Sequence, residues 1–419
     1  MHDRRAFLTL LGGASLAWPR TLEGLGRRWA GGGGPEDRAF WQDVRAAFLI
    51  PEDRIYLNNG TLGPPPRVVV EAVEEHGRRV AATVPPGVAW DDLKAALSGF
   101  LGGDPGGWVV PRNTTEAMNF VAHGLDLGPG DEVLTTDHEH IGGLEPWRLV
   151  TARRGATLRV VSLPVPARSP GELLEAVWAG VGPRTRVVSV SHVTFTTGTT
   201  LPVADLAARC AGAGVVLAVD GAHPPGMMQV DLGVPFGDFY ASSPHKWMLA
   251  AQGTGLLYLT EPWRERLWPT LASGGWDDRS LGAQRFNHMG TMDESRMAGL
   301  LAAIGFLEEL GMERVEARVR ALRRRLRTAV ESLPGVRVVT PADEALASGM
   351  LSFGLDGVDS LDLQAWLSRT ANVRTRVIGE YDYGWMRLST HVYNTEAEID
   401  RVSDLLARAV RSGVPSRTG

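Results

Sequence analysis

Cysteine is almost absent from this chain of 419 residues, in which Cys210 is the only one. A single thiol excludes an internal disulfide and a metal site built on a cluster of cysteines. Positive charge is not in excess either, because the formal net charge is -5. The composition therefore predicts no binding to nucleic acid or to an anionic lipid surface. No apolar run reaches the length of a membrane span.

Lysine is the second scarce residue, since Lys94 and Lys246 are the only two in the chain. Arginine stays protonated and cannot form an imine, so chemistry that needs an amine nucleophile depends on one of these lysines. Lys246 is the stronger candidate, because it follows an expected strand end and the polar residues Ser243 and His245. The alternative is an ordinary surface lysine on a loop.

The first 35 residues differ from the rest of the chain. Arg4 and Arg5 precede a short, mildly apolar stretch over residues 8–18, and glycines at 31–34 form a spacer. Paired arginines before such a stretch resemble a twin-arginine export signal. A loose helix with two chance arginines is the alternative. We expect residues 1–35 to be signal and spacer and the protein to be exported, with a cytoplasmic location as the alternative.

After this segment, short β-branched runs alternate with helical stretches such as residues 115–124 and 203–213. The runs are continuously apolar, which predicts strands covered on both faces and a sheet that is largely parallel. Ligands of such sheets bind at the carboxyl ends of the strands. The seven expected strands are residues 107–111, 132–136, 158–163, 186–191, 215–220, 239–242 and 255–259.

A second unit is expected after Pro334. Residues 293–333 are predicted to be helical, with Arg318 to Arg327 as a basic, solvated face. Thr395 and Glu398 have capping-box spacing at the start of a last helix. We predict a large domain over 36–310 and a small α+β domain over 311–419. The small domain has expected strands at 336–340, 350–355, 373–378 and 385–389 and expected helices at 360–369 and 395–411.

An acid ends one of the most apolar of these runs. Asp220 follows residues 215–219, and a carboxylate in such a buried place must meet a cation or strong hydrogen-bond donors. A structural helix cap satisfies that requirement. So does the protonated ring nitrogen of a pyridine cofactor, which Asp220 would keep charged so that the ring acts as an electron sink.

Two polar segments follow other strand ends. Asn113 to Ala117 form a strand-to-helix turn, where hydroxyls and free N–H groups suit a phosphate, so Thr115 and Glu116 are candidate cofactor contacts. Ordinary helix capping explains the same residues. Residues 137–140 hold two acids and two histidines, but no helical zinc spacing accompanies them, so no metal is predicted.

Asp220-Gly221-Ala222-His223, followed by Ser243-Pro244-His245-Lys246, resembles the class V aminotransferase family of fold-type I pyridoxal 5′-phosphate (PLP) enzymes. That family includes cysteine desulfurases, selenocysteine lyases and isopenicillin N epimerase-like proteins. The similarity extends from about Tyr56 to Asp400. It implies an α/β fold-type I architecture, in which a mostly parallel seven-stranded sheet forms the large domain. It also implies PLP as cofactor, an amino acid or amine as substrate, and a homodimer.

The resemblance also implies roles for the residues that contact the cofactor ring. Lys246 is the Schiff-base lysine and the proton carrier, and Asp220 pairs with the pyridine nitrogen. His140 stacks on the pyridine face, so these three are the expected catalytic residues. His223 lies near the phenolic oxygen of the ring.

Further roles concern the phosphate and the substrate. Thr115, Ser243 and His245 match phosphate contacts, and Thr291 lies on a loop that matches one reaching the phosphate of the neighbouring subunit. Arg387 matches the arginine that binds a substrate carboxylate, where a bidentate ion pair supplies both energy and orientation. A surface arginine at a strand end is the alternative for Arg387.

The sequence differs from the cysteine desulfurases of this family at two places. Desulfurases carry a nucleophilic cysteine on a small-domain loop, whereas residues 334–419 here contain none. Cys210 lies in an expected helix as a small core residue. Phe195 stands where desulfurases often have an asparagine near the ring oxygen. Residues 286–293 are most similar to the epimerase-like branch.

The sequence therefore predicts a PLP-dependent enzyme of the class V aminotransferase type. One sequence does not decide the fate of the substrate after it loses its Cα proton, because groups from several loops decide it. The alternatives are an amino-acid epimerase, a lyase that cleaves a carbon–sulfur or similar bond, and a non-catalytic protein that binds PLP.

The export signal leads to a test in living cells. A fusion of residues 1–35 to a folded reporter should leave the cytoplasm, because twin-arginine signals export folded proteins. The double substitution Arg4→Lys and Arg5→Lys should retain the reporter inside, as measured by cell fractionation. Export that survives the double substitution would contradict the twin-arginine interpretation.

Overall fold

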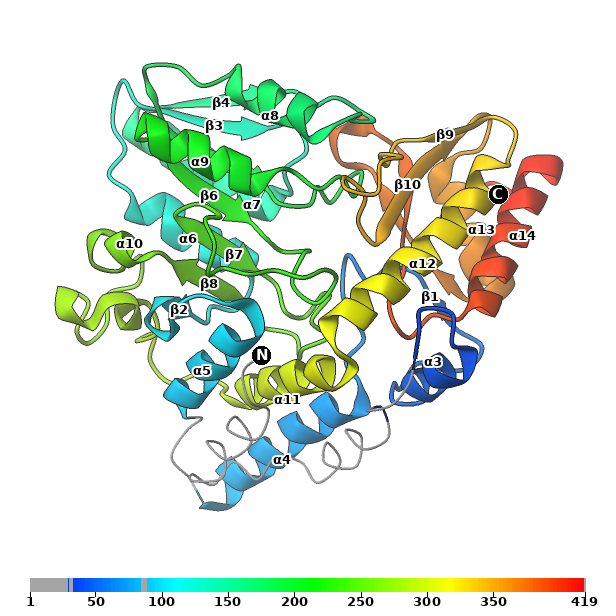
Figure 1. Cartoon of the computed structure of the whole chain (residues 1–419), viewed down its shortest axis with the longest axis horizontal. Helices are drawn as coiled ribbons and strands as arrows, with labels where there is room; N and C mark the ends of the chain where they lie inside the picture. The colour runs from blue at the N-terminus through cyan, green and yellow to red at the C-terminus, as the bar shows by residue number, and fades with distance from the viewer. Residues whose placement is uncertain (1–28, 30–32, 84–88, 418–419) are drawn as a thin grey trace.

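The computed structural model describes residues 29, 33–83 and 89–417. Figure 1 shows a larger unit around the long sheet and a smaller unit beside it, with α12 (Met312–Glu331) running between the two. The expected apolar stretch of the export signal and residues 31–32 of its spacer lie outside the described residues. Within the described ranges, no helix is both long and apolar enough to cross a membrane.

The predicted seven-stranded, mostly parallel sheet is confirmed. Its strand order is β2-β8-β7-β6-β5-β3-β4. Neighbouring strands from β4 to β7 pair in parallel, whereas β8 pairs antiparallel with both β7 and β2. The strands are β2 (Trp108–Val109), β3 (Glu132–Thr136), β4 (Thr157–Val161), β5 (Thr185–Ser191), β6 (Val216–Asp220), β7 (Phe239–Ser242) and β8 (Leu256–Leu259).

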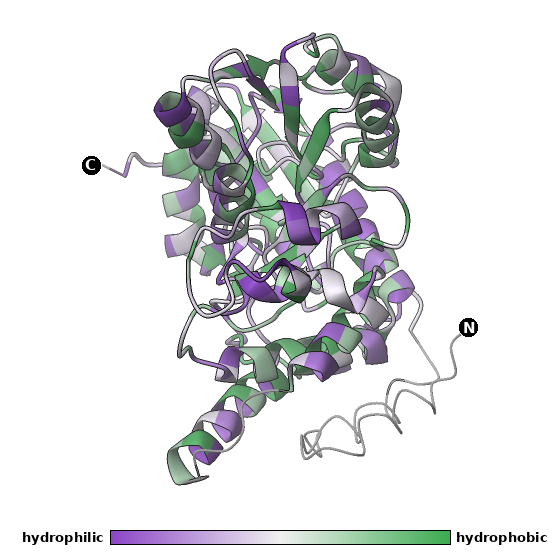
Figure 2. Ribbon diagram, turned by 90° about the vertical axis from the view of Figure 1, so that its left-hand side faces the viewer, coloured by the Kyte–Doolittle hydropathy of each residue, from purple (hydrophilic) through white to green (hydrophobic). Residues whose placement is uncertain are grey.

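Helices cover this sheet on both faces, which explains the continuous apolar runs. In β5, Val187 packs in one core cluster with Trp147 of α7, while the next residue, Val188, packs in another with Leu206 of α9. Figure 2 shows apolar strands inside a more polar shell of helices. These helices are α6 (Thr114–Gly124), α7 (Ile141–Arg154), α8 (Pro170–Trp178) and α9 (Val203–Ala213), and α10 (Glu261–Arg266) follows β8.

The smaller unit is an antiparallel sheet of order β12-β13-β10-β9 packed against helices. The capping box of Thr395 and Glu398 is confirmed, since each side chain accepts a hydrogen bond from the backbone N–H of the other. The strands are β9 (Val336–Val338), β10 (Met350–Leu355), β12 (Arg376–Ile378) and β13 (Trp385–Ser389), and the helices are α13 (Ser360–Ala371) and α14 (Glu396–Ser412).

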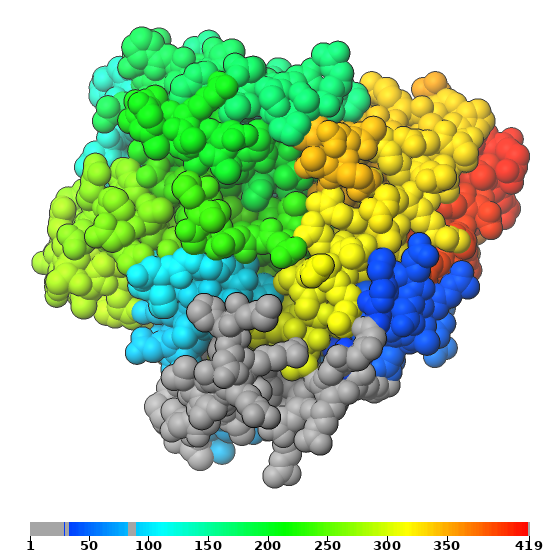
Figure 3. Space-filling model, viewed as in Figure 1, coloured from blue at the N-terminus to red at the C-terminus, as the bar shows by residue number. Residues whose placement is uncertain are grey.

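The N-terminal segment joins the two units. Strand β1 (Ile55–Tyr56) pairs in parallel with β11 (Val373–Arg374), and Leu57 is buried in the core of the smaller unit. Figure 3 shows the first described residues against the C-terminal end of the chain. The segment also contains α3 (Arg38–Arg45), followed by α4 (Arg67–Thr83), α5 (Trp90–Leu101) and, later in the chain, α11 (Ser295–Leu310), which packs on α4. The division at residue 310 stays a prediction.

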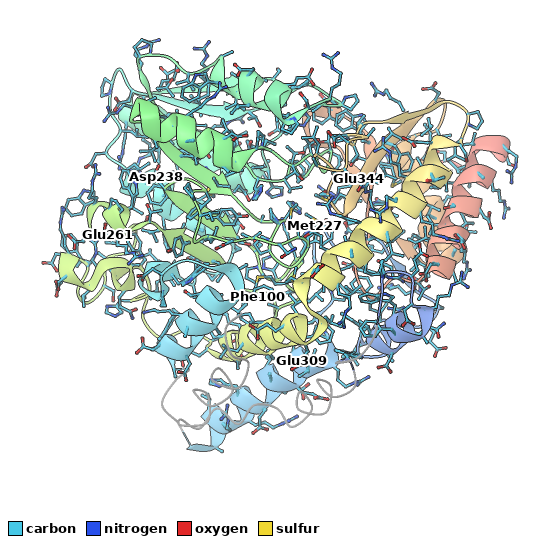
Figure 4. The ribbon with its side chains drawn as sticks, viewed as in Figure 1. Phe100, Met227, Asp238, Glu261, Glu309 and Glu344 are labelled. Atoms are coloured by element: carbon cyan, nitrogen blue, oxygen red, sulfur yellow. The ribbon has the colours of Figure 1, made fainter. Side chains whose placement is uncertain are left out.

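The expectation that Arg318 to Arg327 form a solvated face is wrong for two of these arginines. Arg318 is 1% exposed and Arg323 is 0% exposed on α12. Arg318 pairs with Glu396 at 2.5 Å, and Arg323 pairs with Glu344 at 2.7 Å. Glu344 is labelled beside α12 in Figure 4. Arg318 is tolerated there because Glu396 neutralises it and the carbonyls of Pro35 and Asn394 accept its hydrogen bonds. Arg323 is neutralised by Glu344.

Because some arginines of α12 are buried and others are exposed, replacing them should change the stability of the protein by different amounts. Arg318→Met should lower the free energy of unfolding by about 3–5 kcal/mol, because it breaks a buried pair with Glu396 and leaves that carboxylate without its counter-charge. Arg325→Met is the matched control, since Arg325 pairs with Asp400 at a largely exposed position of the same helix. Arg325→Met should lower the free energy of unfolding, measured with urea, by at most about 1 kcal/mol. Equal losses would contradict the assignment.

Candidate active site

A cavity of about 340 Å³ lies at the carboxyl ends of β5, β6 and β7, where the large sheet faces the smaller unit. Most of the residues singled out in the sequence line it. A larger cavity of about 550 Å³, at the amino ends of β5 and β6, contains none of them. The smaller cavity is lined by Gly60, Thr61, Asn113, Thr114, Thr115, His140, Gly142, Ser191, Phe195, Asp220, Ala222, His223, Ser243, His245, Lys246, Arg376 and Arg387.

Lys246 follows β7 and projects its amine into this cavity. Burial lowers the pKa of the amine to about 8, with the charge of Asp220 opposing that shift and the charge of Arg387 adding to it. An amine with this pKa is neutral in roughly a tenth of molecules at pH 7, far more than an ordinary lysine. Lys246 is therefore suited to attack a carbonyl and to exchange a proton.

The backbone of Lys246 is held by the N-terminal segment. The Gly63 N–H donates to the carbonyl of His245 at 2.9 Å, and Asn59 Nδ2 donates to the carbonyl of Lys246 at 3.4 Å. A Cβ at Gly63 would lie 1.9 Å from the Lys246 carbonyl oxygen. Only glycine fits this approach, so the segment that joins the two units also fixes the lysine.

Asp220 ends β6 opposite Ser191 of β5 in the parallel ladder. Its Oδ1 accepts the Ala222 N–H at 2.9 Å, and no hydrogen bond from the described residues reaches Oδ2. Burial raises the pKa of Asp220, while the charge of Lys246 lowers it. A buried carboxylate with one free oxygen facing a cavity fits a cationic N–H group of a ligand.

The start of α6 forms an anion cradle beside Lys246. Asn113 caps the helix by accepting the Glu116 N–H at 2.9 Å. Ser243 Oγ accepts the Thr114 N–H at 3.2 Å and lies 2.7 Å from Thr114 Oγ1. His245 Nδ1 donates to the Thr254 carbonyl at 3.0 Å, which leaves Nε2 for the cavity. Hydroxyls and a helix N-terminus suit a phosphate group.

His140 is the residue before α7. Its Nδ1 accepts the Gly142 N–H at 3.1 Å, so the proton of the neutral ring is on Nε2. Burial, together with the charges of Lys246 and Arg387, lowers the pKa of His140 to about 3. His140 is thus a neutral ring at the edge of the cavity, suited to stacking rather than to proton transfer.

Arg387 is 2% exposed, and no carboxylate of the described residues lies within ion-pair distance. It donates to the Phe195 carbonyl at 2.8 Å and to Thr61 Oγ1 at 3.0 Å, while its Nε has no hydrogen-bond partner in the described part of the chain. Burial lowers the pKa of Arg387 to about 9, and the charge of Arg376 on the neighbouring strand adds to that shift. The site therefore holds a guanidinium that has no acidic partner among the residues that the structure describes.

Two of the expected cofactor contacts are not brought into the cavity. Glu116 instead accepts from Arg112, with which it forms a 2.7 Å ion pair. Thr291 is exposed and does not line the cavity of its own chain, so its predicted reach into a neighbouring subunit stays a prediction. The other expected site residues, from Thr115 to Arg387, all line the cavity, although their contacts with a ligand stay predictions.

Other residues at the site were not predicted. Arg376 lines the cavity opposite Arg387, and its guanidinium pairs with Glu380. Glu139 lies behind the cavity, where it accepts hydrogen bonds of 2.6 Å from Thr136 and Ser191. Burial raises the pKa of Glu139 to about 7. The acid beside His140 was the available signal for Glu139, whereas no sequence pattern distinguished Arg376.

Comparisons with known proteins agree with this geometry. A sequence model of the family described as Aminotransferase class-V matches residues 88–402. An isopenicillin N epimerase from Streptomyces clavuligerus is 34% identical over 390 residues, which cover 88% of this chain and 98% of that protein.

Solved structures show the same fold. A cysteine desulfurase from Thermococcus onnurineus superposes with a TM-score of 0.78 at 24% identity, over 88% of this chain and 98% of that one. A variant of C-DES, with glycine covalently linked to its PLP cofactor, superposes with a TM-score of 0.76 at 26% identity, over 87% and 98% of the two chains. On the extent of the family match and the identity to the epimerase, this chain belongs to the class V aminotransferase family.

Proposed function

We propose that this chain is a PLP-dependent epimerase that acts at the Cα atom of an amino acid. The observation that carries the proposal is the shared cavity of Lys246 and Arg387. Arg387 is a buried guanidinium that forms no ion pair with any described acidic residue, and a guanidinium can bind a carboxylate through two parallel hydrogen bonds. Lys246 supplies an amine of lowered pKa beside it, as a carrier for the Cα proton.

The residues of the cavity fit PLP. Asp220 would hold the pyridine nitrogen with its free oxygen, and the start of α6 with Ser243 would hold the phosphate. Lys246 would carry the cofactor covalently. When bound, PLP supplies an electron sink that makes the Cα proton of an amino acid acidic.

Of the titratable residues that line the cavity, one is suited to carry the Cα proton of the substrate. His140 stays neutral because its pKa is about 3, and its Nδ1 lone pair accepts the Gly142 N–H. Asp220 and the histidines His223 and His245 are assigned to the ring and the phosphate. Lys246 is therefore the group that takes the Cα proton, and inversion requires that a proton then reach Cα from the opposite face.

Epimerisation is supported by the relative named isopenicillin N epimerase, which aligns with this chain over 98% of its own length. Transamination is the second candidate. It is favoured by the single proton carrier, because one lysine on one face suffices to move a proton from Cα to the cofactor. Cleavage of a carbon–sulfur bond is the third, since C-DES is described as a cystine C–S lyase.

Desulfuration by a protein thiol has no support at this site. Cys210 is buried on α9, and it is not among the residues that line the cavity. Burial and, to a lesser degree, the charge of Asp238 raise the pKa of its thiol to about 12. A thiol of this pKa supplies almost no thiolate at neutral pH.

Cys210→Ser should therefore leave turnover within about twofold of the unchanged protein on every accepted substrate. It should lower stability only modestly, by about 1 kcal/mol, because a small buried group becomes polar. Steady-state rates and urea unfolding check both expectations. A folded Cys210→Ser protein without turnover, or a persulfide on Cys210 after incubation with cysteine, would reverse the exclusion of desulfuration.

Product analysis in deuterated water tests the reaction. Purified protein loaded with PLP is incubated with a panel of L-amino acids, including some with long acidic side chains. We expect the D-epimer with deuterium at Cα and the amine retained. Lys246→Ala is the control and should lose at least about 1000-fold in rate, because no group replaces the amine.

Each of the other candidate reactions would give a different product. A keto acid with amine transferred to the cofactor means transamination, and released fragments mean a lyase. Borohydride reduction followed by peptide mapping should place the cofactor on Lys246. An adduct on Lys94 instead would refute the site, since Lys94 Nζ donates to Gln284 and does not line the cavity.

A further inference from the structure

Trp247 follows the candidate cofactor lysine directly and is fully buried, at 0% exposure. It does not line the cavity, but its indole Nε1–H donates to His223 Nδ1 at 3.0 Å. His223 does line the cavity and is 3% exposed. Trp247 is therefore in direct contact with a site residue from behind, on the side away from any ligand.

This hydrogen bond decides where the proton of His223 lies. An indole N–H can only donate, so Nδ1 of His223 must accept and carries no proton. The neutral ring then has its proton on Nε2. No other hydrogen bond of His223 is made within the described residues, so Nε2 is the nitrogen left for the cavity. Burial lowers the pKa of His223 well below its ordinary value, which keeps the ring neutral.

A second histidine holds Trp247 from the other side. The Val392 N–H donates to His391 Nδ1 at 2.8 Å, so the proton of His391 must lie on Nε2. That Nε2–H donates to the carbonyl of Trp247 at 3.0 Å. His391 is fully buried and follows β13 of the smaller unit, and burial lowers its pKa to about 4. Trp247 thus connects two histidines, each held as one tautomer.

We propose that Trp247 is a positioning residue that holds His223 as its Nε2–H tautomer, so that the cavity keeps a neutral hydrogen-bond donor facing the ring of the cofactor. A fixed donor on His223 is needed because Phe195, which lines the same cavity, has no polar group in its side chain. A donor that must serve an anionic oxygen is useful only if its proton points inward. The inference rests on the proposed binding of PLP, but not on which reaction the enzyme catalyses.

Removal of the indole N–H tests the proposal. Trp247→Phe keeps an aromatic ring beside His223 but frees Nδ1 to take the proton. A donor to the phenolic oxygen stabilises its anionic form, so the loss of that donor should raise the pKa of the bound chromophore. We expect the pH midpoint of its visible absorption to rise by about one pH unit in the holoenzyme.

A matched control separates this effect from the loss of any buried tryptophan. Trp147 is also 0% exposed, and its Nε1–H donates to Ser189 Oγ at 2.8 Å, but neither residue lines the cavity. Trp147→Phe should therefore lower stability without moving the midpoint. An equal shift in both variants would overturn the proposal, because it would report a general loosening of the domain.

A double substitution tests whether Trp247 acts through His223. Methionine has no N–H or O–H for Trp247 to orient, unlike an amide, which can flip. In a His223→Met protein, the added change Trp247→Phe should therefore leave the midpoint within about 0.2 pH units. A shift as large as in the single variant would mean that Trp247 acts by packing alone, and the proposal would fail.

Nitrogen NMR of the unchanged protein with 15N-labelled histidine covers the case in which Trp247→Phe does not fold. The signal of His223, assigned by its absence in His223→Met, should show a protonated Nε2 and an unprotonated Nδ1. The opposite tautomer would overturn the proposal. A protein that binds PLP and shows this tautomer, but epimerises no amino acid, would disprove the proposed reaction and leave this inference standing.

Discussion

The site depends on two opposite charges held out of water at the same edge of one sheet. Asp220 ends β6, and Lys246 follows β7, so parallel pairing of these strands brings the carboxylate and the amine together. Each shifts the pKa of the other against the effect of burial. Because an unpaired charge would be costly there, the pair also requires that the helices on both faces exclude water and leave one cavity between them.

The smaller unit completes the lining of the cavity. It contributes Arg387 from β13 and, on the strand beside it, Arg376 of β12. It also contributes His391, which reaches the backbone of Trp247 in the large unit. The N-terminal segment crosses between the units and places Gly63 against the lysine backbone. The proposed carboxylate-binding residue and the proposed proton carrier thus come from different parts of the chain. Contacts between the units, such as that from His391 to the Trp247 carbonyl, hold these parts together.

The convergence of strand ends in a parallel sheet predicted that Asp220 and Lys246 lie close together. The family resemblance, and not this rule, indicated Arg387, which lies on the other sheet. The sequence predicted solvated arginines on α12 wrongly, because helical spacing does not show that Glu396 and Glu344 approach from other segments. For the same reason it did not identify Arg376 or the contact between Trp247 and His223. Glu116 was placed among cofactor contacts by its position in a turn, whereas its side chain turns to Arg112.

The sequence by itself indicated the sheet through its apolar runs and the family through the resemblance of Asp220 to His223 and Ser243 to Lys246. It also offered only two lysines as candidates for the cofactor amine, because these features are all readable along the chain. Only the tertiary structure decided the charge states of the site residues and the nitrogen atoms that carry their protons. Whether Arg387 lacks an acidic partner, whether Lys246 is neutral near pH 8 and which nitrogen of His223 carries a proton all depend on groups far apart in sequence. Electrostatic interactions and hydrogen bonds act over a few ångströms in space, and only the folded chain defines those distances.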